Sequence, residues 1–191
     1  RARWLMALYF VERTYAIFTS QDLLHWDLLQ KFDLPGDDEC PDLYPLTADD
    51  GRTLWVYSGA HDMYFVGDFD ENGLYQPIQS VGQLSYNSQS YAAQTYYYEP
   101  GKPVIRFAWN RSDIPGAPFN GSMCTPTEMT LKKHGDRYYL SALPIKSTEN
   151  LIVKSDKLDD FTLTHCTHEL GSKTCRISFT VKEGDLTCNL Y

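Results

Sequence analysis

Thr53-Leu54-Trp55-Val56-Tyr57-Ser58 and Met63-Tyr64-Phe65-Val66-Gly67-Asp68 are two short runs rich in aromatic and β-branched residues, separated only by residues 59–62. Such residues favour extended backbone, and a short gap between two such runs is typical of a β-hairpin. The segment Asp70-Glu71-Asn72-Gly73 consists of turn-forming residues and ends the second run. This part of the chain therefore predicts one antiparallel strand pair.

Similar strand pairs recur before and after this hairpin. No long helical period interrupts them, and the class predicted for the chain is all-β. Recurrence at spacings of a few tens of residues favours a β-propeller in which each pair is part of a blade, and a β-sandwich is the alternative that the pattern leaves open. The further pairs are Trp4–Val11 with Tyr15–Thr19, Tyr91–Tyr98 with Pro103–Trp109, and Met129–Lys133 with Arg137–Leu143.

The segments between the pairs and the C-terminal tail differ in character. Residues 27–42 and 110–127 contain Pro and Gly and are predicted to be loops. Beyond Pro144, residues 146–160 are polar and charged and are predicted to be a linker between a domain at 1–145 and a second one at 161–191. Strands are expected in this tail at Phe161–Thr164, Cys175–Val181 and Leu186–Tyr191.

Composition excludes several classes of protein. The 191 residues carry a net charge of −8 without a Lys/Arg stripe, so no nucleic-acid partner is expected. No apolar run approaches membrane-spanning length, and no membrane partner is expected. The five Cys fit no zinc spacing, the five His form no ligand set in the sequence, and we predict neither a metal nor a cofactor. Aromatic residues make up 14%, which suits both strands and a sugar-binding surface.

The segment Asp37-Asp38-Glu39-Cys40-Pro41-Asp42 places four carboxylates within six positions. Like charges this close raise the pKa of at least one member, and a carboxylic acid that stays protonated near neutral pH is suited to general acid catalysis. Taken alone, such a run is more typical of a solvated acidic loop than of a catalytic group.

The acidic run belongs to an ordered series of short motifs. This series resembles glycoside hydrolase family 32, which contains invertases, levanases, inulinases and other β-fructofuranosidases, and the similarity extends from about Trp4 to about Ile145. In chain order the motifs are Ser20-Gln21-Asp22-Leu23-Leu24-His25-Trp26, Asp37 to Asp42, Gly67-Asp68-Phe69-Asp70, Tyr91-Ala92-Ala93-Gln94-Thr95, Phe107-Ala108-Trp109, Pro115-Gly116-Ala117-Pro118-Phe119-Asn120 and Pro126-Thr127-Glu128-Met129-Thr130-Leu131.

The resemblance implies a five-bladed β-propeller with the active site in its funnel, followed by a β-sandwich. It implies retaining hydrolysis of β-fructosyl linkages in fructans or sucrose-like sugars, with Glu39 as the acid/base. Cys40 and Asp42 become candidates for substrate contact. The alternatives are a small buried hydrophobe for Cys40 and, for Asp42, hydrogen bonds to backbone that shape the loop.

Three residues farther along the chain also become candidates for contact with the substrate. Tyr91 matches a family Tyr near the leaving group, and Trp109 matches a Trp of the funnel floor, although each could be ordinary core. Gln89 stands where the family often has an Asp that helps to bind the sugar next to fructose. This departure favours a longer fructan over sucrose.

Two family motifs are absent from the 191 residues: the Asn-Asp-Pro-Asn-Gly type motif that carries the nucleophile, and the Arg-Asp-Pro motif. We therefore expect an interior fragment of an enzyme, inactive alone, with a partial propeller at 1–145 and the first sandwich strands at 161–191. A propeller that binds sugar without hydrolysing it is the alternative, and a related family acting on arabinan or xylan is disfavoured by Glu-Cys-Pro-Asp. The compartment is open, and the resemblance favours secreted or periplasmic proteins.

Overall fold

The computed structural model describes residues 3–86, 88–96, 101–155, 157 and 176–184. The chain divides into two compact units, Arg1–Ile152 and Val153–Tyr191. The division falls within the linker predicted at 146–160, where a short 3₁₀ helix, η1, spans Lys146–Leu151. Among the described residues, no helix is long and apolar enough to cross a membrane.

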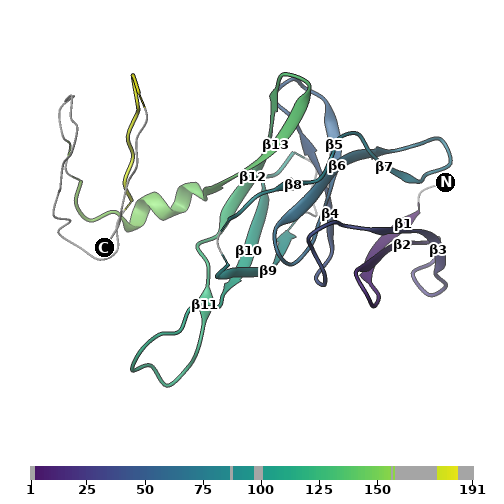
Figure 1. The fold of residues 1–191 in the computed structure, drawn as a ribbon, viewed down its shortest axis with the longest axis horizontal. Coiled ribbons are helices and arrows are strands. Elements are labelled where there is room, and N and C mark those ends of the chain that lie inside the picture. Colours follow the sequence, from purple (N-terminus) through teal and green to yellow (C-terminus); the bar gives the residue numbers. More distant parts are fainter. Residues whose placement is uncertain (1–2, 87, 97–100, 156, 158–175, 185–191) are drawn as a thin grey trace. The chain divides into compact units, whose positions relative to one another are not determined.

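In the described part of the first unit, the strands form three antiparallel sheets that follow one another along the chain (Figure 1). The first sheet has the order β1-β2-β3, the second contains β4 to β8, and the third contains β9 to β13. Their bounds are β1 Trp4–Tyr9, β2 Thr14–Ser20, β3 Asp27–Asp33, β4 Asp42–Thr47, β5 Thr53–Ser58, β6 Met63–Phe69, β7 Tyr75–Pro77, β8 Gly82–Gln83, β9 Ser90–Tyr96, β10 Val104–Asn110, β11 Ser122–Met123, β12 Thr127–His134 and β13 Arg137–Pro144.

The second and third sheets repeat one plan. On one side β6 pairs with β5, and on the other it pairs with β7 and β8, which act as one interrupted strand. Likewise β10 pairs with β9 on one side and with β11 and β12 on the other. Each sheet is thus a small antiparallel unit of about four strands, as in a propeller blade. The structure confirms the all-β class and a partial β-propeller.

The packing explains why the β5–β6 hairpin shows so clearly in the sequence. Side chains alternate across a strand, so Leu54 and Val56 join a core cluster shared with Val104 and Met129 of the third sheet. Tyr57, on the opposite face of β5, joins a second cluster with residues of the first sheet. Both faces of the second sheet are therefore covered. For this reason the sequence of β5 is a nearly continuous apolar run. Burial of each such side chain stabilises the fold by about 1.5–3 kcal/mol.

The structure corrects two sequence predictions. Residues 27–42 are not one loop, because Asp27–Asp33 form β3 and Asp42 begins β4, which leaves residues 34–41 as the loop. The strand β3 lies at the edge of its sheet, three of its seven residues are charged and exposed, and only two of its apolar side chains, Leu29 and Phe32, pack on the core. Its apolar signal in the sequence is therefore weak. In the predicted tail strand Cys175–Val181, residues 176–181 are described and form no strand. The strands predicted at Phe161–Thr164 and Leu186–Tyr191 lie outside the described residues.

Candidate active site

Glu39 lies on residues 34–41, here called the acidic loop, which connects the first sheet to the second. Glu39 (φ 58°) and Cys40 (φ 39°) are both in the left-handed region, which costs an L-residue about 1–2 kcal/mol. Contacts from other strands hold this conformation. The Tyr15 hydroxyl donates to the Glu39 carbonyl oxygen at 3.0 Å, and Gln94 Nε2 donates to the Cys40 carbonyl oxygen at 3.4 Å. The strained turn persists because the surrounding fold determines it.

Asp37 anchors the acidic loop from inside the fold. Its buried carboxylate accepts hydrogen bonds from the backbone N–H groups of Asp38 (2.8 Å), His61 (2.9 and 3.0 Å) and Met63 (3.0 Å). Burial raises the pKa of Asp37, and these N–H donors oppose the rise. Gly59 makes room for the anchor, since a Cβ at that position would lie 2.5 Å from Asp37 Cγ.

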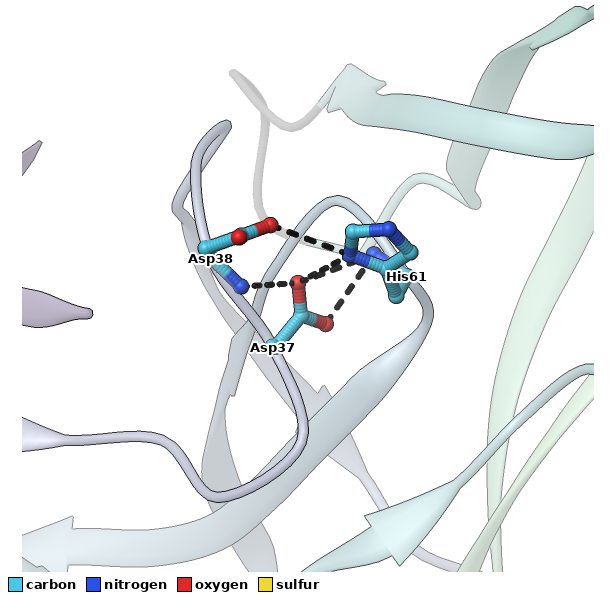
Figure 2. A group of neighbouring side chains, drawn as sticks. All are labelled: Asp37, Asp38 and His61. Atoms are coloured by element: carbon cyan, nitrogen blue, oxygen red, sulfur yellow. Dashed lines mark hydrogen bonds and ion pairs between the residues drawn. The ribbon is translucent and has the colours of Figure 1, made fainter. Parts of the chain in front are cut away.

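The side chain of His61 completes the cluster drawn in Figure 2. Its Nδ1 lies 3.3 Å from an oxygen of Asp37 and 3.3 Å from an oxygen of Asp38. These are residue types that ligate metals. Here, however, both oxygens of Asp37 already accept backbone N–H groups, so hydrogen bonding accounts for the geometry. The sequence did not reveal this cluster, because His61 is separated from Asp37 by 24 positions.

Tyr91 reaches Glu39 from the third sheet. Its hydroxyl donates to Glu39 Oε2 at 2.6 Å, and this hydrogen bond, followed by burial, raises the pKa of Tyr91. A β-bulge sets its direction: the pairing of β9 with β10 shifts register next to Tyr91, and Ala92 takes a φ of 51°. Bulges of this kind re-aim side chains at functional sites. The structure therefore brings the predicted residues Glu39 and Tyr91 together.

Three side chains surround the Tyr91 ring. The His61 ring packs edge-on at 5.0 Å between centroids, Trp109 lies at 6.3 Å, and the guanidinium carbon of Arg111 stands 4.2 Å from the ring centroid. Trp109 is 46% exposed and offers a free aromatic surface near Glu39. Arg111 carries no motif signal, and sequence reasoning missed it.

The remaining predicted residues lie around this group. The Asp42 carboxylate accepts the backbone N–H of Thr95 at 2.6 Å, and burial raises its pKa. Burial also raises the pKa of the half-buried Cys40 thiol. Gln89 is exposed, and its carbonyl oxygen accepts the backbone N–H of Arg111 at 2.9 Å. The roles of Cys40, Asp42 and Gln89 in binding substrate stay predictions.

A buried ion pair joins the second and third sheets close to the site. Arg106 NH2 donates to the carboxylate of Asp62, the residue after His61, and to Ser90 Oγ at 3.1 Å. A cavity of about 380 Å³ beside Arg106 is not lined by Glu39. Glu39 instead faces the exposed surface of the described residues, next to Tyr91.

The chain is similar to known proteins over most of its length. Residues 2–142 match the family model described as Glycosyl hydrolases family 32 N-terminal domain. The chain is 28% identical to a fructan beta-fructosidase of Streptococcus mutans, across 78% of this chain and 12% of that protein. It is 26% identical to a levanbiose-producing levanase of Bacillus subtilis, across 84% and 34%. The exo-inulinase structure from Aspergillus awamori matches with a TM-score of 0.64 and 25% identity, across 74% and 33%. The chain thus spans about a third or less of each of these relatives.

Proposed function

The chain belongs to glycoside hydrolase family 32, and from this premise we propose that it carries the acid/base side of a β-fructosidase active site. The reaction is retaining hydrolysis of β-fructosyl linkages in a fructan or another fructose-containing oligosaccharide. The relatives, named as a fructan beta-fructosidase and a levanase, support this substrate class.

The contact between Tyr91 and Glu39 carries the proposal. The phenol donates to Oε2 at 2.6 Å and so holds the carboxyl group in one orientation. The other oxygen, Oε1, is then the atom that exchanges a proton with the substrate. In the first step Glu39 protonates the departing glycosidic oxygen, and in the second it removes a proton from the attacking water.

The aromatic rings next to Glu39 suit a sugar substrate. Trp109 is 46% exposed and lies edge-on to Tyr91, so the Trp109 ring offers apolar surface to the C–H face of a sugar.

Retention requires a second carboxylate about 5–5.5 Å from the acid/base, which acts as nucleophile. The neighbouring acids do not suit that role, because Asp37 accepts backbone N–H groups on both oxygens and Asp38 faces His61. No Asn-Asp-Pro motif occurs in the 191 residues. We therefore assign the nucleophile to sequence outside them.

Glu39→Gln in the full-length protein tests the proposal. The amide cannot donate the acidic proton, so kcat/KM for fructosides with poor leaving groups should fall about 10²- to 10⁴-fold. Fructosides with activated leaving groups should lose much less, because they need no protonation. Glu71→Gln, which changes an exposed residue of the β6–β7 turn, is the matched control. Equal rates for Glu39→Gln and wild type on both substrate classes would remove Glu39 from this role. Sugar binding by a wild-type protein without hydrolysis would favour a binding propeller instead.

A further inference from the structure

We propose that His61 is a positioning residue for Glu39, and this inference rests on the proposed function. His61 lies in the turn between β5 and β6, at residues 59–62. Its backbone N–H donates to both oxygens of Asp37, at 2.9 and 3.0 Å. The backbone of His61 is thereby fixed beside the acidic loop, although the two residues belong to different segments of the fold.

The imidazole lies where two carboxylates meet. Nδ1 is 3.3 Å from Asp37 Oδ1 and 3.3 Å from Asp38 Oδ1. Figure 2 draws both contacts as dashed lines that meet at the ring. Two adjacent carboxylates repel each other, and an N–H placed between them offsets part of that repulsion. This contact favours the tautomer with the proton on Nδ1. Asp38 directly precedes Glu39, so the imidazole restrains the backbone that carries the acid/base.

The same ring also restrains Glu39 indirectly, through Tyr91. It packs edge-on against Tyr91, with centroids 5.0 Å apart and an interplanar angle of 69°. Edge-to-face aromatic pairs contribute a stabilisation of their own. Tyr91 in turn donates the 2.6 Å hydrogen bond to Glu39 Oε2. His61 therefore connects both supports of the acid/base, the preceding carboxylate and the phenol.

Other charged groups near the ring have their own partners. Asp62 pairs with Arg106, and the Arg111 guanidinium lies over Tyr91 while its NH2 donates to the Ser88 carbonyl oxygen at 2.8 Å. Among the described charged groups near the ring, only His61 thus contacts Asp37, Asp38 and Tyr91 together.

Three substitutions in the full-length protein separate the two contacts of the ring. His61→Ala removes both, His61→Asn keeps a donor near the carboxylates, and His61→Phe keeps an aromatic edge against Tyr91. The readout is kcat/KM on fructosides with poor and with activated leaving groups, because kcat/KM reports the first step, in which the leaving group departs. Misplacement of a catalytic group can cost up to 10²-fold, and we expect His61→Ala to lower kcat/KM about tenfold or more with poor leaving groups. With activated leaving groups the loss should be under about threefold, since that step needs little protonation. The Asn and Phe variants should each recover part of the loss.

His25→Ala is the matched control, because His25 also contacts an Asp but lies in an exposed loop. It should leave both rates unchanged. Equal losses of His61→Ala on both substrate classes, or no loss on either, would overturn the inference. If His61→Ala does not fold, His61→Asn and His61→Phe are compared in the same way on poor and on activated leaving groups, and their losses decide whether the inference holds. Glu39→Gln measured in parallel separates the two proposals. If Glu39→Gln loses the same rate on poor and on activated leaving groups, the proposed function is overturned. If Glu39→Gln loses more rate on poor leaving groups and the His61 variants do not, only the role of His61 is overturned.

Discussion

Two loops of this protein each contain an Asp that contacts a His, and the loops are held in opposite ways. In residues 20–26, which run from the last residue of β2 to the start of β3, Asp22 accepts the N–H groups of Leu24 (2.9 Å) and His25 (2.8 Å). His25 Nδ1 lies 2.8 Å from the second carboxylate oxygen of Asp22. Every partner lies within three positions. In the acidic loop, the partners of Asp37 include His61 and Met63, which are 24 and 26 positions away.

The difference shows which loop depends on the assembled fold. The loop at 20–26 closes itself through its own side chains and backbone, in water. The acidic loop acquires its shape only when the first sheet and the β5–β6 turn pack together, because these supply Tyr15 and His61. The candidate catalytic residue lies on the second kind of loop, where buried donors can impose the left-handed turn at Glu39.

In the full-length protein, Asp37→Ala should have the largest effect on stability. It leaves the N–H groups of His61 and Met63 without their acceptor, and each unsatisfied buried donor costs about 1–3 kcal/mol. The free energy of unfolding, measured with urea, should fall by about 2–4 kcal/mol, and kcat should fall because the turn at Glu39 is released. Asp22→Ala should change both much less. Similar losses of unfolding free energy and of kcat for Asp37→Ala and Asp22→Ala would mean that the long-range contacts of the acidic loop matter no more than the local contacts of residues 20–26.

Gly59→Ala tests the same anchor by crowding. The added Cβ would lie 2.5 Å from Asp37 Cγ and 2.6 Å from the Tyr15 hydroxyl oxygen. Overpacking of a close-packed site costs about 1–3 kcal/mol. We expect a lower urea midpoint together with a lower kcat. Gly51→Ala is the control, because a Cβ there meets nothing within 4 Å and only its φ of +85° is strained. An unchanged kcat for Gly59→Ala in the full-length protein would show that the Asp37 carboxylate does not position Glu39.

The same contrast explains what the sequence could predict. The β5–β6 hairpin was predicted from local pattern because both faces of β5 are buried, through Val56 and Tyr57. The edge strand β3 was missed because few of its side chains reach the core.

Within the site, the acidic run was found from neighbouring carboxylates and from the family motif. Tyr91, which is 52 positions from Glu39, was identified through the resemblance alone. His61 and Arg111 were missed, since their contacts are created by the packing of the second and third sheets and leave no spacing in the sequence.

The smallest expected effect is a pH dependence of opposite sign in the two loops. Hydrogen bonding to the His25 side chain, followed by its backbone N–H, lowers the pKa of Asp22 from 3.8. A group with a lowered pKa in the folded state stabilises the protein above its unfolded pKa, and this contribution disappears as the pH falls below it. The difference in Tm between wild type and Asp22→Asn should therefore be present at about pH 5 and shrink toward about pH 2.

Asp37 should show the reverse trend. Burial raises its pKa in the folded state, so the folded protein holds the protonated form more strongly than the unfolded chain does. Protonated Asp37 contributes to the stability of the folded protein in full below the unfolded pKa of 3.8, and this contribution is lost as the pH rises through the folded pKa. The Tm advantage of wild type over Asp37→Asn should accordingly be larger at low pH and decrease as the pH rises. If both differences move in the same direction with pH, then burial does not distinguish the two loops, and the acidic loop is closed by its local sequence in the same way as residues 20–26.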